Sequence, residues 1–322
     1  MAKQGGSIMA THRAKLIKKT VLSADTTDFC FALEEGQFTG LEPGAHVDIR
    51  LNDDLVRQYS IWNWDQNGKW LNVAVKREDA GRGGSLAMHA LNEGQRVQIS
   101  MPRNHFVLQD GPNHKTLIAG GIGATPIFAM ARQLQNSGAD FRVIYLVRSK
   151  ELAALDDAFS SLNLGDRYQL HCDETSGPIE LKEVMQSVPL NGDIYTCGPE
   201  PLLNAILEAG KSLRGGTIHF ERFAASSDVD HGDNTAFEVE IESTQAVYHV
   251  GPDDSILSVL KQNGIHVDVG CAEGLCGSCM VDVVSGDVDH RDGLLTPEEQ
   301  ASNEVMCLCV SRAKSPKITL GL

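Results

Sequence analysis

The sequence of 322 residues predicts a multidomain chain with an antiparallel β-barrel, a doubly wound parallel α/β domain and a small α+β domain. Three observations support this fold class. Short strands separated by turns fill the first third, strands alternate with helical stretches in the middle third, and closely spaced cysteines mark the last third. A chain of this length can bury two or three separate cores.

The first domain, residues 13–110, follows a tail at residues 1–12 that lacks the apolar core of a signal peptide. Five segments of this domain combine alternating apolar residues with flanking turn residues, which is the pattern of half-buried antiparallel strands. Their even spacing favours a small barrel, interrupted by one short helix at residues 85–91. The predicted strands are 15–22, 46–51, 55–62, 70–76 and 96–101.

Two pieces of this barrel carry groups that suit a flavin. In one strand Arg57 and Tyr59 share a face, where a guanidinium can hold a phosphate and a phenol ring can pack on a planar heterocycle, while Ser60 lies on the other face. The second piece is a glycine-rich turn whose N–H groups can bind a phosphate at the start of the helix. Taken alone, a strand arginine is usually a surface residue and a glycine-rich turn is usually only a turn. The residues of the two pieces are Arg57, Gln58, Tyr59, Ser60, Val75, Lys76, Gly81, Arg82, Gly83, Gly84 and Ser85.

The second domain, residues 111–223, alternates buried strands with helices, which predicts a doubly wound parallel sheet. The predicted strands are 116–119, 141–147, 168–171 and 193–196, and the predicted helices are 124–135, 152–162 and 200–213.

Two turns at the carboxyl ends of these strands are candidates for binding a dinucleotide. The first strand runs into a glycine-rich loop that a pyrophosphate can approach, although Pro126 stands where the G-x-G-x-x-G fingerprint has its last glycine. Pro126 instead suits the first turn of the following helix. Cys197 follows the fourth strand, either as a functional thiol or as a small buried side chain. The residues of the two turns are Gly120, Gly121, Gly123, Thr125, Pro126, Cys197, Gly198 and Pro199.

The preference between NADH and NADPH stays open from the residues alone. After the second strand come Arg148, Ser149 and Lys150 rather than a clear ribose-binding acid. These residues could favour a 2′-phosphate or form an ordinary solvated turn. Residues 224–234, mostly small and polar, then predict a flexible linker.

The third domain, residues 235–322, is organised around Cys271, Cys276 and Cys279. Their C-x4-C-x2-C spacing, with one more cysteine later in the chain, is that of a plant-type [2Fe–2S] site. Cys307 and Cys309 both qualify as the fourth ligand, because strand alternation places them on the same face. A zinc knuckle is less favoured, since it uses paired C-x2-C units and the chain has only one. Strands at 237–241 and 246–250 and a helix at 256–262 precede the cysteine loop.

The charge of the chain disfavours some partners. The net charge is −15, which argues against nucleic acid and against an anionic membrane. Residues 235–322 hold fourteen acidic and five basic side chains, a surplus of nine acids that suits docking on a basic patch of another protein or simply keeps the surface soluble. No run of eighteen apolar residues occurs, and eight cysteines without a disulfide framework fit a cytoplasmic location.

Four motifs together resemble known electron-transfer modules. Arg57 to Ser60 resembles the R-x-Y-S motif of the flavin barrel in the ferredoxin-reductase superfamily, and the glycine-rich turn after Lys76 resembles the phosphate loop of its FMN-using members. Residues 120–126 resemble the G-G-x-G-x-[TS]-P motif and residues 197–199 the C-G-P motif of the NAD(P)H-binding domain. The third domain resembles plant-type ferredoxins of β-grasp order, in which Val-Ser-Arg follows the last ligand. This resemblance favours Cys309.

The order of the three domains covers nearly the whole chain and resembles the phthalate dioxygenase reductase family, the reductase components of Rieske-type dioxygenases and related demethylases and monooxygenases. The resemblance implies FMN, because no adenine-binding extension follows the phosphate turn, and NADH, with NADPH possible. It implies hydride transfer near Cys197, Ser60 and Phe223, where Phe223 either approaches the flavin or packs in the core. It implies a [2Fe–2S] cluster on Cys271, Cys276, Cys279 and Cys309, and a Rieske-type oxygenase that docks on the acidic third domain.

Other functions share these motifs. A reductase that serves a cytochrome P450 and a stand-alone flavin or ferric reductase would carry the same residues. A [2Fe–2S] carrier or redox sensor with a decayed reductase half is disfavoured, because the flavin and nucleotide motifs are intact.

Overall fold

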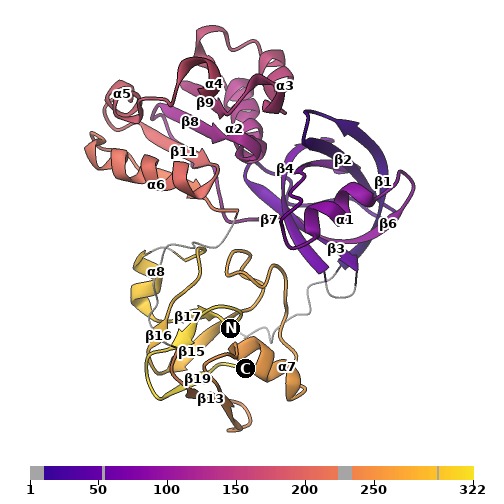
Figure 1. Ribbon diagram of the computed structural model, residues 1–322, viewed down its shortest axis with the longest axis vertical. Coiled ribbons are helices and arrows are strands. Elements are labelled where there is room, and N and C mark those ends of the chain that lie inside the picture. Colours follow the sequence, from indigo (N-terminus) through magenta and orange to yellow (C-terminus); the bar gives the residue numbers. More distant parts are fainter. Residues whose placement is uncertain (1–10, 53–54, 224–233, 296) are drawn as a thin grey trace. The chain divides into compact units, whose positions relative to one another are not determined.

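The computed structural model describes residues 11–52, 55–223, 234–295 and 297–322, and the chain forms two compact units, Thr11–Phe223 and a C-terminal unit that ends at Leu322 (Figure 1). The predicted tail at 1–12 is too long, because Thr11 and His12 already pair with Ser100 and Ile99 in the barrel. Residues 1–10 lie outside the described residues, and so does the predicted linker except Asn234. No helix of the described residues is long and apolar enough to cross a membrane.

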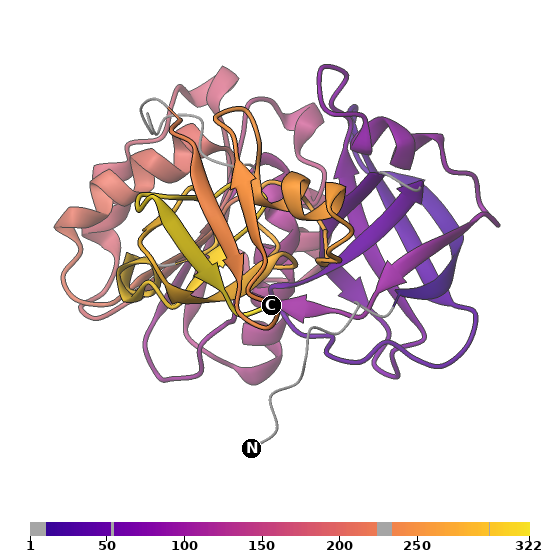
Figure 2. The same cartoon turned by 90° about the horizontal axis from the view of Figure 1, so that it is seen from below.

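The first part of the larger unit is the predicted antiparallel barrel (Figure 2). Among the described residues its strands follow the order β4-β5-β2-β1-β6-β3-β7, and pairing of β3 with β4 closes it. Its apolar core includes Leu16, Phe29, Ile49 and Met88. Strand β2 was not among the predicted segments. The elements are β1 Thr11–Val21, β2 Thr26–Leu33, β3 Ala45–Asn52, β4 Leu55–Trp64, β5 Trp70–Lys76, α1 Gly84–Ala90, β6 Arg96–Ser100 and β7 Arg103–Asn104.

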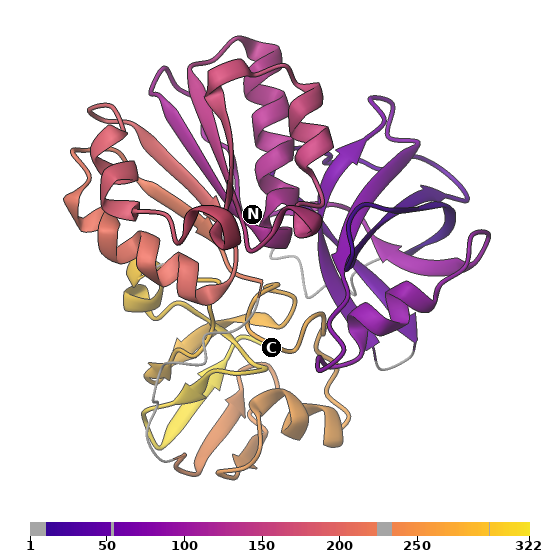
Figure 3. The same ribbon diagram turned by 45° about the horizontal axis from the view of Figure 1, so that its top comes forward.

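The second part of this unit is the predicted doubly wound sheet, with strand order β10-β9-β8-β11-β12 and parallel pairing. Alternate side chains of its strands enter two apolar clusters, so that Leu117 packs with α2 and α3 on one face while Ile118 packs with α5 and α6 on the other (Figure 3). The strands are β8 Lys115–Gly120, β9 Phe141–Val147, β10 Tyr168–Cys172, β11 Asp193–Cys197 and β12 Ile218–Glu221. The helices are α2 Ala124–Ser137, α3 Asp156–Ser161, α4 Asp173–Ser176, α5 Leu181–Ser187 and α6 Glu200–Ala209.

Two predicted helices of this domain are wrong in length. The stretch predicted at 152–162 is helical only from Asp156, because Ala153 leaves helical geometry and the buried residues Ala154 and Leu155 pack on the core. The stretch predicted at 200–213 ends as an α-helix at Ala209 and continues as a 3₁₀ turn. Gly210 packs so closely under Ile218 that a Cβ would lie 2.1 Å from the Ile218 Cδ1. Helix α5 and strand β12 were not predicted.

The C-terminal unit is a mixed sheet with order β14-β13-β19-β15-β17, next to the two-stranded β16–β18 ribbon, within the described residues. Helix α7 begins at the predicted residue, where Ser255 and Ser258 form reciprocal hydrogen bonds in a capping box. The elements are β13 Phe237–Ile241, β14 Val247–Val250, α7 Ile256–Gln262, β15 Met280–Ser285, β16 Val288–Asp289, α8 Pro297–Ser302, β17 Val305–Cys307, β18 Arg312–Ala313 and β19 Lys317–Leu320.

Candidate functional site

The structure brings Arg57 together with the glycine-rich turn before α1. The Arg57 Nη2 atom donates to the Arg82 carbonyl oxygen at 3.0 Å, and a Cβ on Gly84 would lie 2.5 Å from the Arg57 Cγ. Gly83 has φ +78°, a conformation that glycine adopts without strain. The guanidinium and the backbone of this turn therefore form one cradle that fits a phosphate group.

The other residues predicted for the flavin differ in their surroundings. Arg57 and Tyr59 oppose Ile49 and Val47, whereas Ser60 opposes His46 on the other face of β4, as predicted. The Gln58 Nε2 atom is buried without a partner among the described residues, so it is available to a ligand. Ser85 instead bonds within the turn, where its Oγ accepts from the Glu78 N–H at 3.0 Å.

At the end of β5, Val75 is buried, and its carbonyl oxygen lies 2.9 Å from the His89 Nε2. The Lys76 Nζ lies 2.7 Å from the Glu78 Oε1. These two residues thus fix the strand end that precedes the phosphate cradle.

The two predicted nucleotide turns meet at the carboxyl edge of the parallel sheet. A Cβ on Gly123 would lie 2.2 Å from the Cys197 carbonyl oxygen, and one on Gly120 would lie 2.4 Å from the Leu202 Cδ2. Pro126 lies in the first turn of α2, and the Thr125 Oγ1 donates to the Ile122 carbonyl oxygen at 3.0 Å. Residues 121–123 form a 3₁₀ turn that leads into α2. Close packing against the backbone of Cys197 and Gly198 therefore requires glycine at position 123, whereas at position 120 a Cβ would meet the side chains of Leu202 and Pro199.

A carboxylate that the sequence analysis did not assign joins Ser60 to Cys197. The Ser60 Oγ donates to the Glu221 Oε2 at 3.3 Å, and the Cys197 Sγ lies 3.9 Å from the same oxygen. Cys197 and Glu221 are register partners at the ends of β11 and β12. Recognising β12 as a strand parallel to β11 would have placed Glu221 beside Cys197. Three strands from two domains thus converge on one polar cluster, defined here as the Ser60–Glu221–Cys197 cluster.

Burial controls the protonation of this cluster. It raises the pKa of the Glu221 carboxyl to about 8, although hydrogen bonds from Ser60 and Cys197 act in the opposite direction. Burial, followed by the charge of Glu221, raises the pKa of the Cys197 thiol well above its ordinary value. The cluster therefore holds a neutral thiol beside a carboxyl group that changes charge near pH 8.

Replacing Glu221 with glutamine is expected to remove a pH dependence of stability. With the folded pKa near 8 and an ordinary value of 4.5, the folded state keeps a proton that the unfolded state releases, so the wild type loses stability as the pH rises between these values. Between pH 5.5 and 8.5 the wild type should lose about 1–3 kcal/mol more unfolding free energy than Glu221→Gln does. This figure is smaller than the full linkage effect, because Glu221 keeps some exposed surface. Urea unfolding followed by tryptophan fluorescence measures this, since Trp62, Trp64 and Trp70 all lie in the larger unit.

The matched control for this prediction is Glu208→Gln, which removes an exposed carboxylate paired with Lys211 on the same domain. Its stability curve should run parallel to that of the wild type across the same pH range. A Glu221→Gln curve that also ran parallel to the wild type would contradict the raised pKa.

Phe223, predicted to approach the flavin, is 40% exposed at the end of the described part of this unit. No ring contact of Phe223 is present in the described residues. Next to it, the Arg222 Cζ lies 5.3 Å from the centre of the Phe220 ring, and the Arg222 Nη1 lies 3.7 Å from the Glu200 Oε1. The role of Phe223 thus stays a prediction.

The cysteine loop of the C-terminal unit aims backbone N–H groups at sulfur atoms. Cys271 N–H donates to the Cys276 Sγ at 3.2 Å, Glu273 N–H to the Cys271 Sγ at 3.3 Å, and Gly274 N–H to the Cys309 Sγ at 3.2 Å. The hydrogen bond with the Cys271 thiol lowers the pKa of Cys276 below its ordinary value. Thiols held in this way by amide groups fit the thiolate ligands of an iron–sulfur cluster.

Both candidates for the fourth ligand lie within hydrogen-bond reach of the Cys279 thiol, but their other surroundings differ. Strand β17 ends at Cys307, and the chain turns at Cys309, so the expectation that both thiols share one strand face is wrong. Cys307 is fully buried in the apolar core with Met306 and Leu308. Cys309 is partly exposed, and its sulfur faces the Gly274 amide of the cysteine loop. This geometry favours Cys309.

No three His, Cys, Asp or Glu side chains of the described residues gather closely enough to hold a single metal ion. A [2Fe–2S] cluster has a different requirement, because its four thiolates are divided between two iron atoms. The donor set of four cysteines with amide donors fits this binuclear group.

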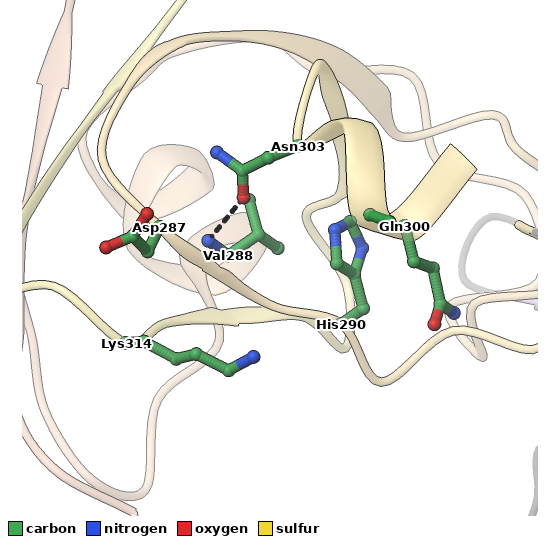
Figure 4. A pocket seen from close by; sticks show the side chains of 7 residues that line it. Asp287, Val288, His290, Gln300, Asn303 and Lys314 are labelled. Atoms are coloured by element: carbon green, nitrogen blue, oxygen red, sulfur yellow. Dashed lines mark hydrogen bonds between the residues drawn. The ribbon is translucent and has the colours of Figure 1, made fainter. Parts of the chain in front are cut away.

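Residues 290–295, which follow β16, pack against the cysteine loop. The Gly293 N–H donates to the Gly274 carbonyl oxygen at 3.1 Å, and the buried Asp292 accepts from the Leu295 N–H at 2.9 Å. His290 lies 3.5 Å from Asp292 and points toward α8 beside a hollow of about 500 Å³ (Figure 4). No residue that the sequence assigns to a cofactor lines this hollow. Its lining residues are Asp287, Val288, His290, Gln300, Ala301, Asn303 and Lys314.

Comparison with protein families identifies two of the three domains. Residues 239–314 match the 2Fe-2S iron-sulfur cluster binding domain, and residues 13–108 match the oxidoreductase FAD-binding domain. Vanillate O-demethylase oxidoreductase of Pseudomonas sp. (strain HR199 / DSM 7063) is 39% identical over 294 residues, which cover 89% of this chain and 92% of that protein.

Two solved structures resemble the whole chain. The structure of phthalate dioxygenase reductase, described as a modular structure for electron transfer from pyridine nucleotides to [2Fe-2S], matches with a TM-score of 0.72 and 32% identity over 97% of this chain and 98% of that chain. Full-length CYP116B46 from Tepidiphilus thermophilus matches with a TM-score of 0.80 and 32% identity over 97% of this chain. This chain spans only 42% of that protein.

Proposed function

Because this chain belongs to the phthalate dioxygenase reductase family and is an NAD(P)H-dependent flavin and iron–sulfur oxidoreductase, we propose that it passes electrons from NADH through FMN and the [2Fe–2S] cluster to a separate Rieske-type oxygenase. The observation that carries the proposal is the Ser60–Glu221–Cys197 cluster, which joins the flavin barrel to the nucleotide turns. The vanillate O-demethylase and phthalate dioxygenase named for the relatives support an oxygenase as the acceptor.

The residues of the larger unit have distinct binding roles in this proposal. Arg57 and the turn at residues 81–84 hold the flavin phosphate, and the glycines at 120, 121 and 123 admit the pyrophosphate of NADH. Ser60 lies at the flavin side of the polar cluster and Cys197 at the nicotinamide side. When bound, the flavin accepts a hydride and gives up electrons singly, and the cluster carries one electron at a time.

Glu221 supplies a proton route in this proposal. A hydride carries two electrons and one proton, so one proton remains after both electrons have been passed on. The Ser60 hydroxyl is hydrogen-bonded to Glu221, whose pKa of about 8 suits it to accept or release a proton near neutral pH. Cys197 stays a neutral thiol and contributes shape and polarity rather than a charge.

FMN is preferred over FAD because of the phosphate cradle and its surroundings. The turn at residues 81–84 leads directly into α1, and β6 follows after Ala90 with no segment long enough to form an adenine-binding extension in this part of the barrel. The Arg57 guanidinium lies against the turn at residues 81–84, so it can bind a terminal phosphate together with the N–H groups of that turn.

The acceptor is proposed to dock on the C-terminal unit. Fourteen acidic and five basic side chains in residues 235–322 give this unit a negative surface that a basic patch would complement. The rate at which an oxygenase takes electrons from the reduced protein should then fall as salt is raised from 20 to about 300 mM, because screening shortens the reach of surface charges.

An anaerobic titration tests the proposal. NADH should bleach the flavin and iron–sulfur absorbance of the purified protein, NADPH should do so more slowly, and acid should release FMN. Addition of an oxidised Rieske-type oxygenase should restore the cluster absorbance. A cluster that stays oxidised after NADH is added would refute the electron path, and release of FAD would refute the choice of flavin.

A cytochrome P450 as acceptor is the second candidate, and the match to the structure of an intact type IV self-sufficient cytochrome P450 monooxygenase, 29% identical over this chain, favours it. The same experiment separates the two acceptors. Faster reoxidation of the cluster by an isolated P450 haem domain than by a Rieske-type oxygenase would replace the first proposal with the second.

A further inference from the structure

The barrel and the nucleotide domain touch through β4 and α2 (Figure 3). The Trp62 ring meets the Phe128 ring edge-on, with centroids 5.5 Å apart. One turn further along α2, Arg132 places its Cζ 4.3 Å from the centre of the Trp64 ring and donates a hydrogen bond to the Asn63 Oδ1. These five side chains, Trp62, Asn63, Trp64, Phe128 and Arg132, are called the β4–α2 clamp below.

Each half of the clamp is fixed to its own domain. The Trp62 Nε1 donates to the Asp28 Oδ1 at 2.8 Å, and the Asn72 Nδ2 holds the other oxygen of this buried carboxyl at 2.6 Å. On the other side, Phe128 packs on Phe159 with centroids 5.2 Å apart. Trp62 is thus held by a buried partner in the barrel, and Phe128 by one in the nucleotide domain. Strand β4 therefore has little freedom to slide along α2.

The clamp lies next to both halves of the hydride path. Ser60 precedes Trp62 by two residues on β4, on the same face of the strand. Helix α2 continues directly from the nucleotide loop at residues 120–123, which contacts the backbone of Cys197 and Gly198. The separation between Ser60 and the nucleotide loop is therefore set by two short rigid elements that the clamp joins.

We infer that the β4–α2 clamp sets the distance between flavin and nicotinamide, and that Arg132 is a positioning residue for hydride transfer. The inference rests on the proposed function. Within the described residues, the Arg132 side chain contacts Asn63 and Trp64 of β4, so it acts by holding α2 against this strand. A planar guanidinium over an indole ring is well suited to this task, because stacking and a directed hydrogen bond together fix both position and orientation.

A displacement of the nucleotide loop by a fraction of an ångström affects rate more than binding. NADH would still reach its loop, whereas the reacting atoms would lose their alignment, so the limiting rate should fall with little change in affinity. A contact that only stabilised the fold would lower the melting temperature and leave the limiting rate unchanged.

The test compares Arg132→Ala with Arg167→Ala by anaerobic stopped-flow reduction with NADH. Arg167 is a matched control, because it also places a guanidinium over an aromatic ring and donates a hydrogen bond. Its Cζ lies 5.0 Å from the centre of the Phe141 ring, and its Nη2 donates to the Gln135 side chain of α2 at 2.7 Å. Both of these partners belong to the nucleotide domain. We expect Arg132→Ala to lower the limiting rate of flavin reduction at least about tenfold, with the dissociation constant of NADH within about twofold of the wild type. Arg167→Ala should lower the melting temperature about as much as Arg132→Ala does, and it should leave the limiting rate of flavin reduction unchanged.

Two further measurements keep the inference testable. Trp64→Phe retains a ring under Arg132 and should keep most of the rate. Hydrogen exchange of residues 121–125 should become faster in Arg132→Ala but not in Arg167→Ala, whether or not NADH reduces the protein.

Equal limiting rates and equal exchange in Arg132→Ala and Arg167→Ala would overturn the inference. A wild-type protein that NADH does not reduce would refute the proposed function instead, and hydrogen exchange alone would then decide whether Arg132 holds the loop in place.

Discussion

Cys309→Ser is expected to abolish the visible absorbance of the iron–sulfur cluster, whereas Cys307→Ser should keep it. The Cys309 sulfur accepts a hydrogen bond from Gly274 at 3.2 Å, in the same loop that directs two N–H groups at Cys271. Serine oxygen is a poor substitute for thiolate toward iron, so the cluster should be lost along with its iron and sulfide. Reduction of the flavin by NADH should persist, because both of its proposed sites lie in the larger unit.

Cys307→Ser is the matched control for this prediction. Its side chain is fully buried in the apolar core beside the Cys279 thiol, and a buried hydroxyl should cost about 1–3 kcal/mol of stability without removing a ligand. Cys307→Ala avoids the hydroxyl and should retain the cluster as well. Iron content and visible spectra of the three variants decide between the two cysteines. Loss of iron from both Cys307 variants, with iron retained in Cys309→Ser, would show that the ligand assignment is wrong.

The fold was largely predictable because its elements carry local signals. Alternation of apolar and polar residues placed β5 at its observed bounds, and a mostly apolar run of buried-strand length did so for β9. The capping serine before α7 marks a helix start that depends only on neighbouring residues. Strand β2 was not predicted. Its first six residues are buried, including polar residues such as Asp28, so the usual alternation is absent. The burial of Asp28 depends on Trp62 and Asn72, which are distant in the sequence.

The site was predictable where a motif is continuous in the sequence. The cysteine spacing and the glycine-rich turns each lie within one short stretch, and the structure brings Arg57 to one turn and Cys197 to another. Glu221 was not assigned, because its role depends on the register of β11 with β12 and on a contact across two domains. The choice between Cys307 and Cys309 likewise needed the end of β17, since a turn after Cys307 cancels the strand alternation.

Gly123→Ala is expected to block reduction of the flavin by NADH while leaving flavin and cluster in place. Gly123 has φ −59°, which alanine adopts freely, so the effect is purely steric. The added Cβ would lie 2.2 Å from the Cys197 carbonyl oxygen and 2.7 Å from the Gly198 nitrogen, both backbone atoms that cannot rotate away. The nucleotide loop and the turn after β11 must therefore move apart, at the edge where Cys197 meets Glu221.

A shift of about 1 Å at this edge should lower the rate of flavin reduction by NADH roughly 100-fold, because hydride transfer depends steeply on the alignment of the reacting atoms. Chemical reduction with dithionite should still bleach flavin and cluster in Gly123→Ala, which would show that both units are folded. Gly138→Ala is the matched control: its φ is +69° and no atom lies within 4 Å of the added Cβ, so it should cost about 1 kcal/mol of stability without slowing reduction. Equal rates in Gly123→Ala and Gly138→Ala would mean that the close approach of residues 123 and 197 is not part of the path from NADH, and the position of the nucleotide would have to be sought elsewhere on the sheet.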